Sequence, residues 1–327
     1  MTGMASSHPG DSLLKRPSRR RTVLRWVFLV AALALLAWTV RNQGSDISDR
    51  VSSLSIQAAV AAEAAILASL GCSVLAWRLL LASLGSRLPL AAASRIFFFG
   101  QLGKYLPGSG WTLIGHMELA RDLSVPRRRA IAASVLGLAL GCLTATLLGG
   151  TVMALTTRSD LASPWWFLVI PPTLLMLVEP RILGTVLDTA LRVARREPLE
   201  YRPTRRAMIA ATAWSLAAWA MLGIHVWLLA RDLGGSGSGL SLLVLGAYAV
   251  AWLAGFLAVF APAGLGAREA VLTFGLTSSL SSGSAALLAV TSRLLITVAD
   301  LLAAAISAVA AGRHRARPAP RPPSEDG

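Results

Sequence analysis

The chain has 327 residues, of which 55% are hydrophobic and only 14% are charged. Soluble domains carry about a quarter charged residues, so this composition, with a mean hydropathy of +0.62, excludes an ordinary soluble domain and indicates a polytopic membrane protein. The net charge of +15 does not indicate nucleic-acid binding, because nearly all basic residues lie at the ends of apolar segments. The four histidines have no metal-ligand spacing, so we propose no zinc site. We also expect no cofactor.

Long apolar runs divide the chain into membrane-embedded segments. A helix needs about 20 apolar residues to cross the hydrocarbon core, and backbone groups in lipid must be hydrogen-bonded within their own segment. The runs do not alternate as the strands of a membrane barrel would. We therefore predict an all-α polytopic membrane bundle with about eight membrane-embedded segments. Seven are the long runs Val23–Val40, Ile56–Leu84, Ala130–Leu155, Trp165–Val178, Ala207–Ala230, Leu240–Phe260 and Ser284–Gly312, and the eighth is the shorter run Ala267–Leu280, which either crosses or is re-entrant.

The segments outside these runs are basic. The first run follows a basic region, as the core of a signal peptide would, but no small-x-small cleavage site occurs around Trp38–Arg41, so we interpret it as a membrane anchor. Tails 1–22 and 313–327, rich in Pro, Ser and Arg, are expected to be disordered and to flank a transmembrane domain of residues 23–312. Arg181–Arg196 has the apolar spacing of an amphipathic helix on the inner membrane surface.

The distribution of basic residues predicts the orientation. Twenty-five lysines and arginines fall in the two tails and in the loops of one side. Only four, Arg41, Arg50, Arg158 and Arg231, fall in the opposite loops. Because positive charge favours the cytoplasmic side, we expect a multi-pass protein of the cell membrane with both termini in the cytoplasm.

Two segments are interrupted by proline and glycine. Phe97–Trp111 is too polar and glycine-rich for a spanning helix and too apolar for a solvated loop, and Ala261–Glu269 interrupts the second half in the same way. Such backbone survives at membrane depth only inside protein or beside a wet cavity. Paired breaks in two halves are typical of a transporter's substrate site, and a pair of tight interfacial turns is the alternative.

The second break also carries a resemblance. Pro262–Glu269, which reads P-A-G-L-G-A-R-E, resembles the G-G-L-G-x-R-E signature of the lysylphosphatidylglycerol synthase transmembrane-region family, whose members are flippase-like membrane domains. Gln101–Arg121 is similar to the family's first PG…E/D…R motif in its actinobacterial form, although Trp111 and Thr112 replace residues of the usual glycine-rich run. Arg293 stands where the family has a membrane arginine.

The resemblance covers about Val23–Gly312 and implies a flippase-like fold and a role in lipid transport. Only residues 313–327 follow it, so the aminoacyl transfer of the family's bifunctional members is not expected of this chain.

Ionisable residues within the apolar runs are candidate site residues, because each costs about 2.5–3.5 kcal/mol to insert. Arg268 is the best candidate for an anionic headgroup, since its guanidinium binds phosphate bidentately. Arg293 and Asp300 lie seven residues apart on one helix face, which predicts either a salt bridge or a shared headgroup or coupling-ion site. Glu63 has either a structural partner or a proton-carrying role. Glu269 could also cap a helix start.

Other features indicate packing. Small residues at every fourth position from Ala133 to Gly149 let another helix approach closely, within the monomer or between two copies. His225 is expected to form a buried hydrogen bond between helices.

We therefore predict a non-enzymatic protein that binds and translocates an anionic phospholipid or a polyprenyl-phosphate-linked lipid, as a monomer or a homo-oligomer. The sequence has no P-loop and no arranged hydrolytic residues. A scaffold for a glycosyltransferase or lipid synthase is the alternative, which scattered and individually paired charges would favour; an embedded transferase would need carboxylates around a metal. The candidate substrate-binding residues are Lys104, Pro107, Gly108, Arg121, Gly264, Gly266, Arg268 and Arg293, and the candidate charge-balancing or proton-coupling residues are Glu63, Glu118, Glu269 and Asp300.

Overall fold

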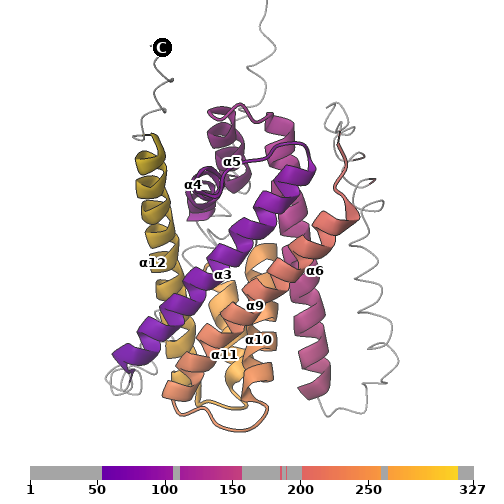
Figure 1. Ribbon diagram of the computed structural model, residues 1–327. Helices are drawn as coiled ribbons and strands as arrows, with labels where there is room; N and C mark the ends of the chain where they lie inside the picture. Colours follow the sequence, from indigo (N-terminus) through magenta and orange to yellow (C-terminus); the bar gives the residue numbers. More distant parts are fainter. Residues whose placement is uncertain are drawn as a thin grey trace, which may run out of the picture.

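The computed structural model describes residues 54–105, 111–156, 185, 189, 201–258 and 264–315. Every regular element in this part of the chain is a helix, which confirms the predicted all-α class. The elements are α3 (Ile56–Ser83), α4 (Leu90–Gln101), the 3₁₀ helix η2 (Leu102–Tyr105), α5 (Trp111–Arg121), α6 (Arg127–Thr156), α9 (Arg205–Asp232), α10 (Leu240–Leu257), α11 (Ala267–Leu276) and α12 (Ser282–Arg315) (Figure 1).

Five of these helices, α3, α6, α9, α10 and α12, are long and apolar enough to cross a membrane. They coincide with five of the seven long apolar runs predicted from the sequence. The runs at 23–40 and 165–178 and both tails lie outside the described residues. So does the predicted amphipathic helix 181–196, apart from Thr185 and Thr189, which are helical. The count of eight embedded segments therefore stays a prediction.

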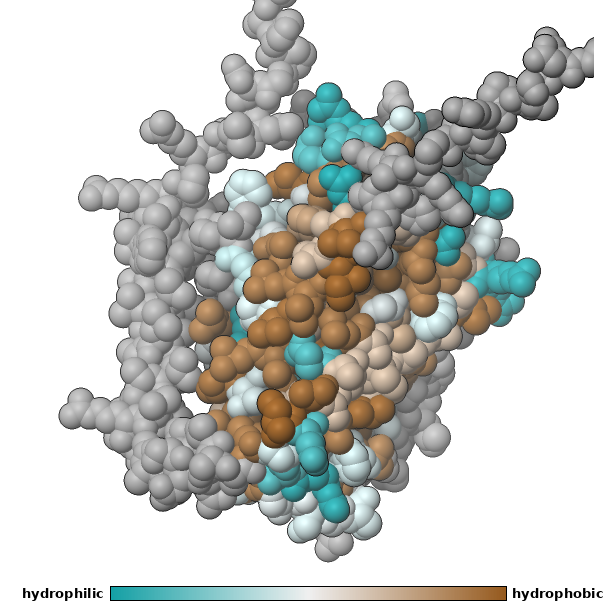
Figure 2. All heavy atoms as spheres, turned by 60° about the vertical axis from the view of Figure 1, so that its left-hand side comes forward, coloured by the Kyte–Doolittle hydropathy of each residue, from teal (hydrophilic) through white to brown (hydrophobic). Residues whose placement is uncertain are grey.

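The surface of the bundle carries a broad hydrophobic band. Figure 2 shows this band across the middle of one face, with hydrophilic residues gathered toward the upper and lower ends. Large apolar side chains point outward, among them Phe274, which is 81% exposed, and Leu257, which is 73% exposed. A continuous apolar surface of this kind is unfavourable in water and matches a lipid environment.

The helices α3 and α9 pack along each other as a diagonal pair (Figure 1). At one end of the pair, Asp232 accepts two hydrogen bonds from Ser55, at 2.7 Å from its backbone N and 2.8 Å from its Oγ. The Ser55 Oγ in turn accepts from the Ala58 N–H and caps the first turn of α3. The end of α9 is thereby fixed to the start of α3, which makes the two helices antiparallel.

The predicted small-residue stripe of α6 packs within the chain. A Cβ at Gly149 would lie 2.8 Å from the side chain of Val250, and a Cβ at Gly141 would face Trp252. A Cβ at Gly246, on α10, would in turn collide with Val152. The stripe therefore allows α6 and α10 to approach closely inside one molecule, which is the intramolecular form of the prediction.

Two helical hairpins contain the proline and glycine breaks. One is α4–η2–α5 and the other is α10–α11; in Figure 1 the first lies in the upper half of the molecule and the second in the lower half. The twelve residues of α4 and the ten of α11 measure about 18 Å and 15 Å, well short of a hydrocarbon core of about 30 Å. The helix of segment 267–280 is therefore too short to cross the membrane on its own, which favours the re-entrant form of the prediction.

In each hairpin, two glycines let two backbone segments pack closely against each other. In the first, Gly115 packs on Gly100, and a Cβ at Gly115 would lie 2.9 Å from the Gly100 Cα. In the second, Gly264 packs on Gly255, where a Cβ would lie 2.6 Å from the Gly255 Cα. Gly264 also has a φ of 70°, which few other residues adopt. Both breaks thus need glycine for close approach of two backbone segments.

Candidate functional site

A cavity of about 810 Å³ lies between the two hairpins and the long helices. Residues from all nine described elements line it, and the charged ones are Lys104, Arg268, Arg293 and Asp300. Much of the remaining wall is aromatic, with tryptophans from α3, α5, α9 and α10. Its volume falls within the range of about 300–1,000 Å³ that is usual for ligand sites. These four charges lie in three separate segments of the sequence, and the fold brings them to one cavity.

Lys104 and Asp300 form an ion pair on one side of the cavity. The Lys104 Nζ lies 2.6 Å from the Asp300 Oδ2, and Asp300 is 2% exposed. The hydroxyl of Tyr105 donates to the same oxygen at 2.5 Å and lies 3.4 Å from the Thr297 Oγ1. These contacts dock η2, at the tip of the first hairpin, onto α12.

Arg268 extends from α11 to α10. Its guanidinium donates a hydrogen bond to the Tyr248 hydroxyl and lies over the Tyr248 ring, 4.7 Å from the centroid. Tyr248 is fully buried, and its ring is held on another side by the ring of His225, at 4.9 Å. His225 forms the predicted buried bond between helices, with 2.9 Å from its Nε2 to the Ser292 Oγ.

Glu269 ties the start of α11 to α12. Its Oε2 accepts a 2.6 Å hydrogen bond from the Gly266 N–H, so it satisfies a free backbone donor at the helix start, one of the roles predicted for it. Its Oε1 lies 3.7 Å from the Arg293 Nη1. Both side chains are largely buried, and only Arg293 lines the cavity.

Arg293 and Asp300 share the cavity, as the helical spacing predicted, but their ion-pair partners differ. Asp300 pairs with Lys104 of the first hairpin, and Arg293 approaches Glu269 of the second. Spacing along one helix carries no information about the two hairpins, which supply the partners of opposite charge.

Glu63 lies on α3 beside this cluster. Both of its carboxylate oxygens are buried, and neither has a hydrogen-bond partner among the described residues.

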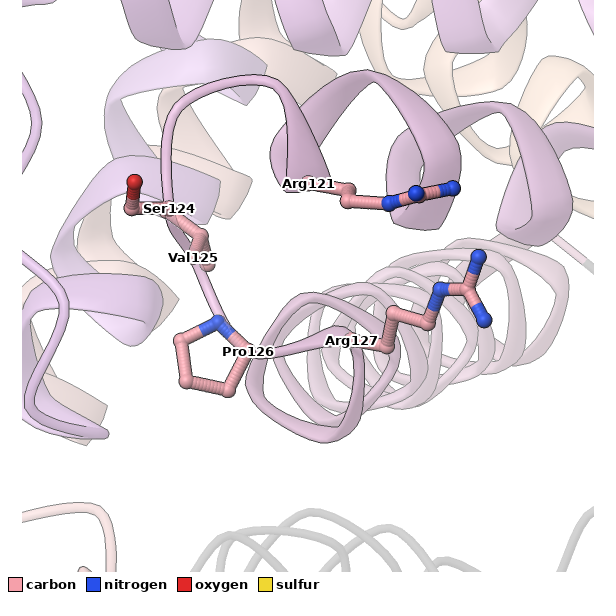
Figure 3. A pocket seen from close by; sticks show the side chains of 5 residues that line it. All are labelled: Arg121, Ser124, Val125, Pro126 and Arg127. Atoms are coloured by element: carbon pink, nitrogen blue, oxygen red, sulfur yellow. The ribbon is translucent and has the colours of Figure 1, made fainter.

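The other predicted site residues lie elsewhere or outside the described part of the chain. Arg121 and Glu118 are exposed on α5, and Glu118 pairs with Arg127 at 3.0 Å. Figure 3 shows Arg121 and Arg127 extending from a shallow hollow at the turn between α5 and α6, a site separate from the cavity. Gly264 lines the cavity and Gly266 donates to Glu269, whereas Pro107 and Gly108 lie outside the described residues.

A buried polar network holds the first hairpin in place. The His116 Nε2 donates to the Phe97 carbonyl at 3.0 Å, which joins α5 to α4. The His116 Nδ1 lies 2.8 Å from the Ser134 Oγ on α6, and the Trp77 Nε1 of α3 donates to that same oxygen at 3.0 Å. Four helices therefore share one network next to the cavity wall.

Sequence reasoning missed Tyr105 and Tyr248, which contact the charged residues directly. The chain has only three tyrosines, and Tyr105 stands within the first break, directly after Lys104. Its position beside a candidate binding residue could have indicated that Tyr105 belongs to the site. Tyr248 lies in an uninterrupted apolar run, where nothing distinguishes it from a core residue.

Comparison with known proteins identifies a family. The sequence model described as lysylphosphatidylglycerol synthase TM region matches residues 25–304. The match covers more than half of the chain and includes both hairpins and every cavity-lining residue. A comparison with curated proteins finds no match.

Proposed function

Since the chain belongs to the lysylphosphatidylglycerol synthase transmembrane-region family, and is a multi-pass membrane protein, we propose that it binds an anionic lipid in the cavity and moves it across the cell membrane. The observation that carries this proposal is the convergence of three cations from three elements. Lys104 of η2, Arg268 of α11 and Arg293 of α12 all line one cavity within an apolar bundle. Buried cations of this kind are costly in hydrocarbon and are typical of a ligand path.

The wall of the cavity suits an amphipathic ligand. Arginine binds a phosphate through two parallel N–H donors, and lysine adds a point charge. The rings of Trp252 and Phe256 stack on another part of the wall, with centroids 5.7 Å apart. Trp111 and Phe256 line the cavity and are 43% and 41% exposed, so this part of the wall is not sealed inside the bundle. A lipid can therefore place its headgroup at the cations while its chains extend toward the bilayer.

The hairpins supply a route for the headgroup. They enter the bundle from opposite ends, and residues near both tips, Lys104 and Gly264, line the same cavity. Movement of either hairpin would open the cavity to one side of the membrane while the other hairpin keeps the second side closed. Pro107 and Gly108 follow η2 in the sequence, and the acids Asp300 and Glu269 balance the cations between passages of lipid.

Reconstituted vesicles test the proposal. The purified protein is inserted into liposomes that contain a trace of fluorescent phosphatidylglycerol, and a membrane-impermeant reductant then measures how much of it reaches the outer leaflet. We expect Arg268→Gln to slow this exchange by about tenfold or more, the loss of a charged hydrogen bond, while Arg121→Gln, the exposed arginine of α5, matches the parent.

Equal rates in the parent, in Arg268→Gln and in empty liposomes would contradict transport of this lipid. Copurification of a glycosyltransferase or lipid synthase with such an inactive protein would then favour the scaffold, for which the individual ion pairs Lys104–Asp300 and Arg293–Glu269 are the supporting observation. The proposed orientation, with both termini in the cytoplasm, follows from the basic residues and is tested separately below.

A further inference from the structure

The charges around the cavity do not cancel. Three cations line it, and two of them have carboxylate partners, since Lys104 pairs with Asp300 and Arg293 with Glu269. Arg268 differs from both, because its direct contacts are the hydroxyl and the ring of Tyr248, which are neutral. Among the described residues no carboxylate lies within ion-pair distance of Arg268.

The sequences of the two Pro/Gly breaks add no further charged residue to those around the cavity. Residues 106–110 read Leu-Pro-Gly-Ser-Gly and residues 259–263 read Val-Phe-Ala-Pro-Ala, so the two breaks contain no ionisable side chain beyond those already named. The remaining nearby acid is Glu63. Its two oxygens are buried without a hydrogen-bond partner among the described residues. An ionised carboxylate in that position would be strongly unfavourable, so the neutral, protonated acid is the form that the site accommodates.

With Glu63 protonated, the described residues of the site carry three positive and two negative charges. We infer that the cavity selects a lipid whose headgroup carries one negative charge, a phosphodiester, and discriminates against lipid diphosphates, which carry at least two. This inference rests on the proposed function and specifies its substrate class. A phosphodiester at Arg268 neutralises the site, whereas a diphosphate leaves an uncompensated negative charge in a largely apolar cavity.

Direct binding measurements test the selection. The full chain in detergent is titrated by native mass spectrometry with short-chain phosphatidylglycerol, with phosphatidylcholine and with farnesyl diphosphate. We expect phosphatidylglycerol to bind about tenfold or more tightly than either competitor, and Arg268→Gln to abolish this preference. The matched control is Arg121→Gln, which removes an arginine outside the cavity.

A charge-conversion variant makes the test specific. Glu269→Gln keeps a side-chain oxygen for the Gly266 N–H but removes the carboxylate charge that faces Arg293, so the net charge of the site rises by one. We expect the lipid preference of Glu269→Gln to shift by about tenfold toward farnesyl diphosphate, because the second negative charge of the diphosphate can then form a charged hydrogen bond with a cation of the site. Asp300→Asn makes the same change through Lys104 and provides a second variant if the first does not fold.

The proton on Glu63 has its own readout. Infrared spectra of the parent are expected to contain the carbonyl stretch of a protonated carboxylic acid that disappears in Glu63→Gln. Absence of that band, equal binding of the two anionic lipids by the parent, or an unchanged preference in both charge-conversion variants would overturn the inference. Lipid transport without headgroup discrimination would overturn only this inference, whereas discrimination without transport would overturn only the proposed function.

Discussion

At the scale of single residues, the ion pair between Lys104 and Asp300 ties η2 of the first hairpin to α12. Asp300 is almost fully buried and accepts from both Lys104 and Tyr105. Removal of one partner from a buried pair leaves an uncompensated charge, which typically costs about 3–5 kcal/mol, whereas removal of both partners is far less damaging. The pair therefore stabilises the contact of η2 with α12 only while both members are present.

A double-mutant cycle on Lys104→Met and Asp300→Asn measures this coupling through thermal unfolding in detergent. We expect each single variant to lose about 3 kcal/mol and the double variant to lose less than the sum of the two. The control cycle uses Glu118→Gln and Arg127→Gln, an exposed pair for which coupling of about 0.5 kcal/mol or less is expected. Additive losses at Lys104 and Asp300 would show that each has another partner.

At the scale of elements, the two hairpins depend on glycine where their backbones touch. Gly100 lies directly under the His116 ring and beside Gly115, so the first hairpin has no space for a methyl group at that position. His116 is fixed in turn by its bonds to Phe97 and Ser134, so its ring cannot swing away without loss of the network. The requirement for glycine therefore comes from tertiary packing and not from helix propensity.

The substitution Gly100→Ala tests this requirement. Alanine normally favours a helix interior by about 1 kcal/mol over glycine, but here we expect a loss of stability of about 2 kcal/mol or more because the added methyl meets the fixed ring. Gly71→Ala is the matched control, since Gly71 also lies within a helix, α3, and nothing would approach its added Cβ within 4 Å. Thermal melts in detergent compare the two. A Gly100→Ala variant as stable as Gly71→Ala would mean that the hairpin is not packed as described.

At the scale of the whole molecule, the sequence predicted the long helices but not their convergence. The apolar runs at 56–84 and 207–230 gave helices to within a few residues, because burial in lipid requires a continuous helix. The pairing of Lys104 with Asp300 joins positions 196 residues apart. No local pattern specifies such a contact, so the spacing of Arg293 and Asp300 suggested a partner on the same helix instead.

The sequence also did not show which basic residues set the topology and which line the cavity. Arg121 and Lys104 stand in one motif, yet Arg121 faces solvent and Lys104 lines the cavity. Arg268, which the orientation argument counts with the inner basic loops, lies in the cavity as well. The basic residues at Arg78 and Arg129 have a further structural role, because each donates to a backbone carbonyl of the segment between α3 and α4. Charge alone does not separate a topology determinant from a ligand-binding residue; depth in the fold does.

The orientation of the whole bundle is testable by cysteine labelling. The end of α3 carries Arg78, and the starts of α6 and α9 carry Arg127–Arg129 and Arg205–Arg206, so this end of the bundle should face the cytoplasm. The turn between α9 and α10 lies at the opposite end of α9 and contains the exposed Ser236. In a chain whose two native cysteines are replaced by alanine, we expect Ser236→Cys to react with an impermeant maleimide added to intact cells, and Asp122→Cys, exposed in the turn between α5 and α6, to react only after lysis. The reverse pattern would invert the bundle. It would also place the first hairpin on the outer side and the second on the inner side, and so exchange the membrane faces to which the two hairpins control access.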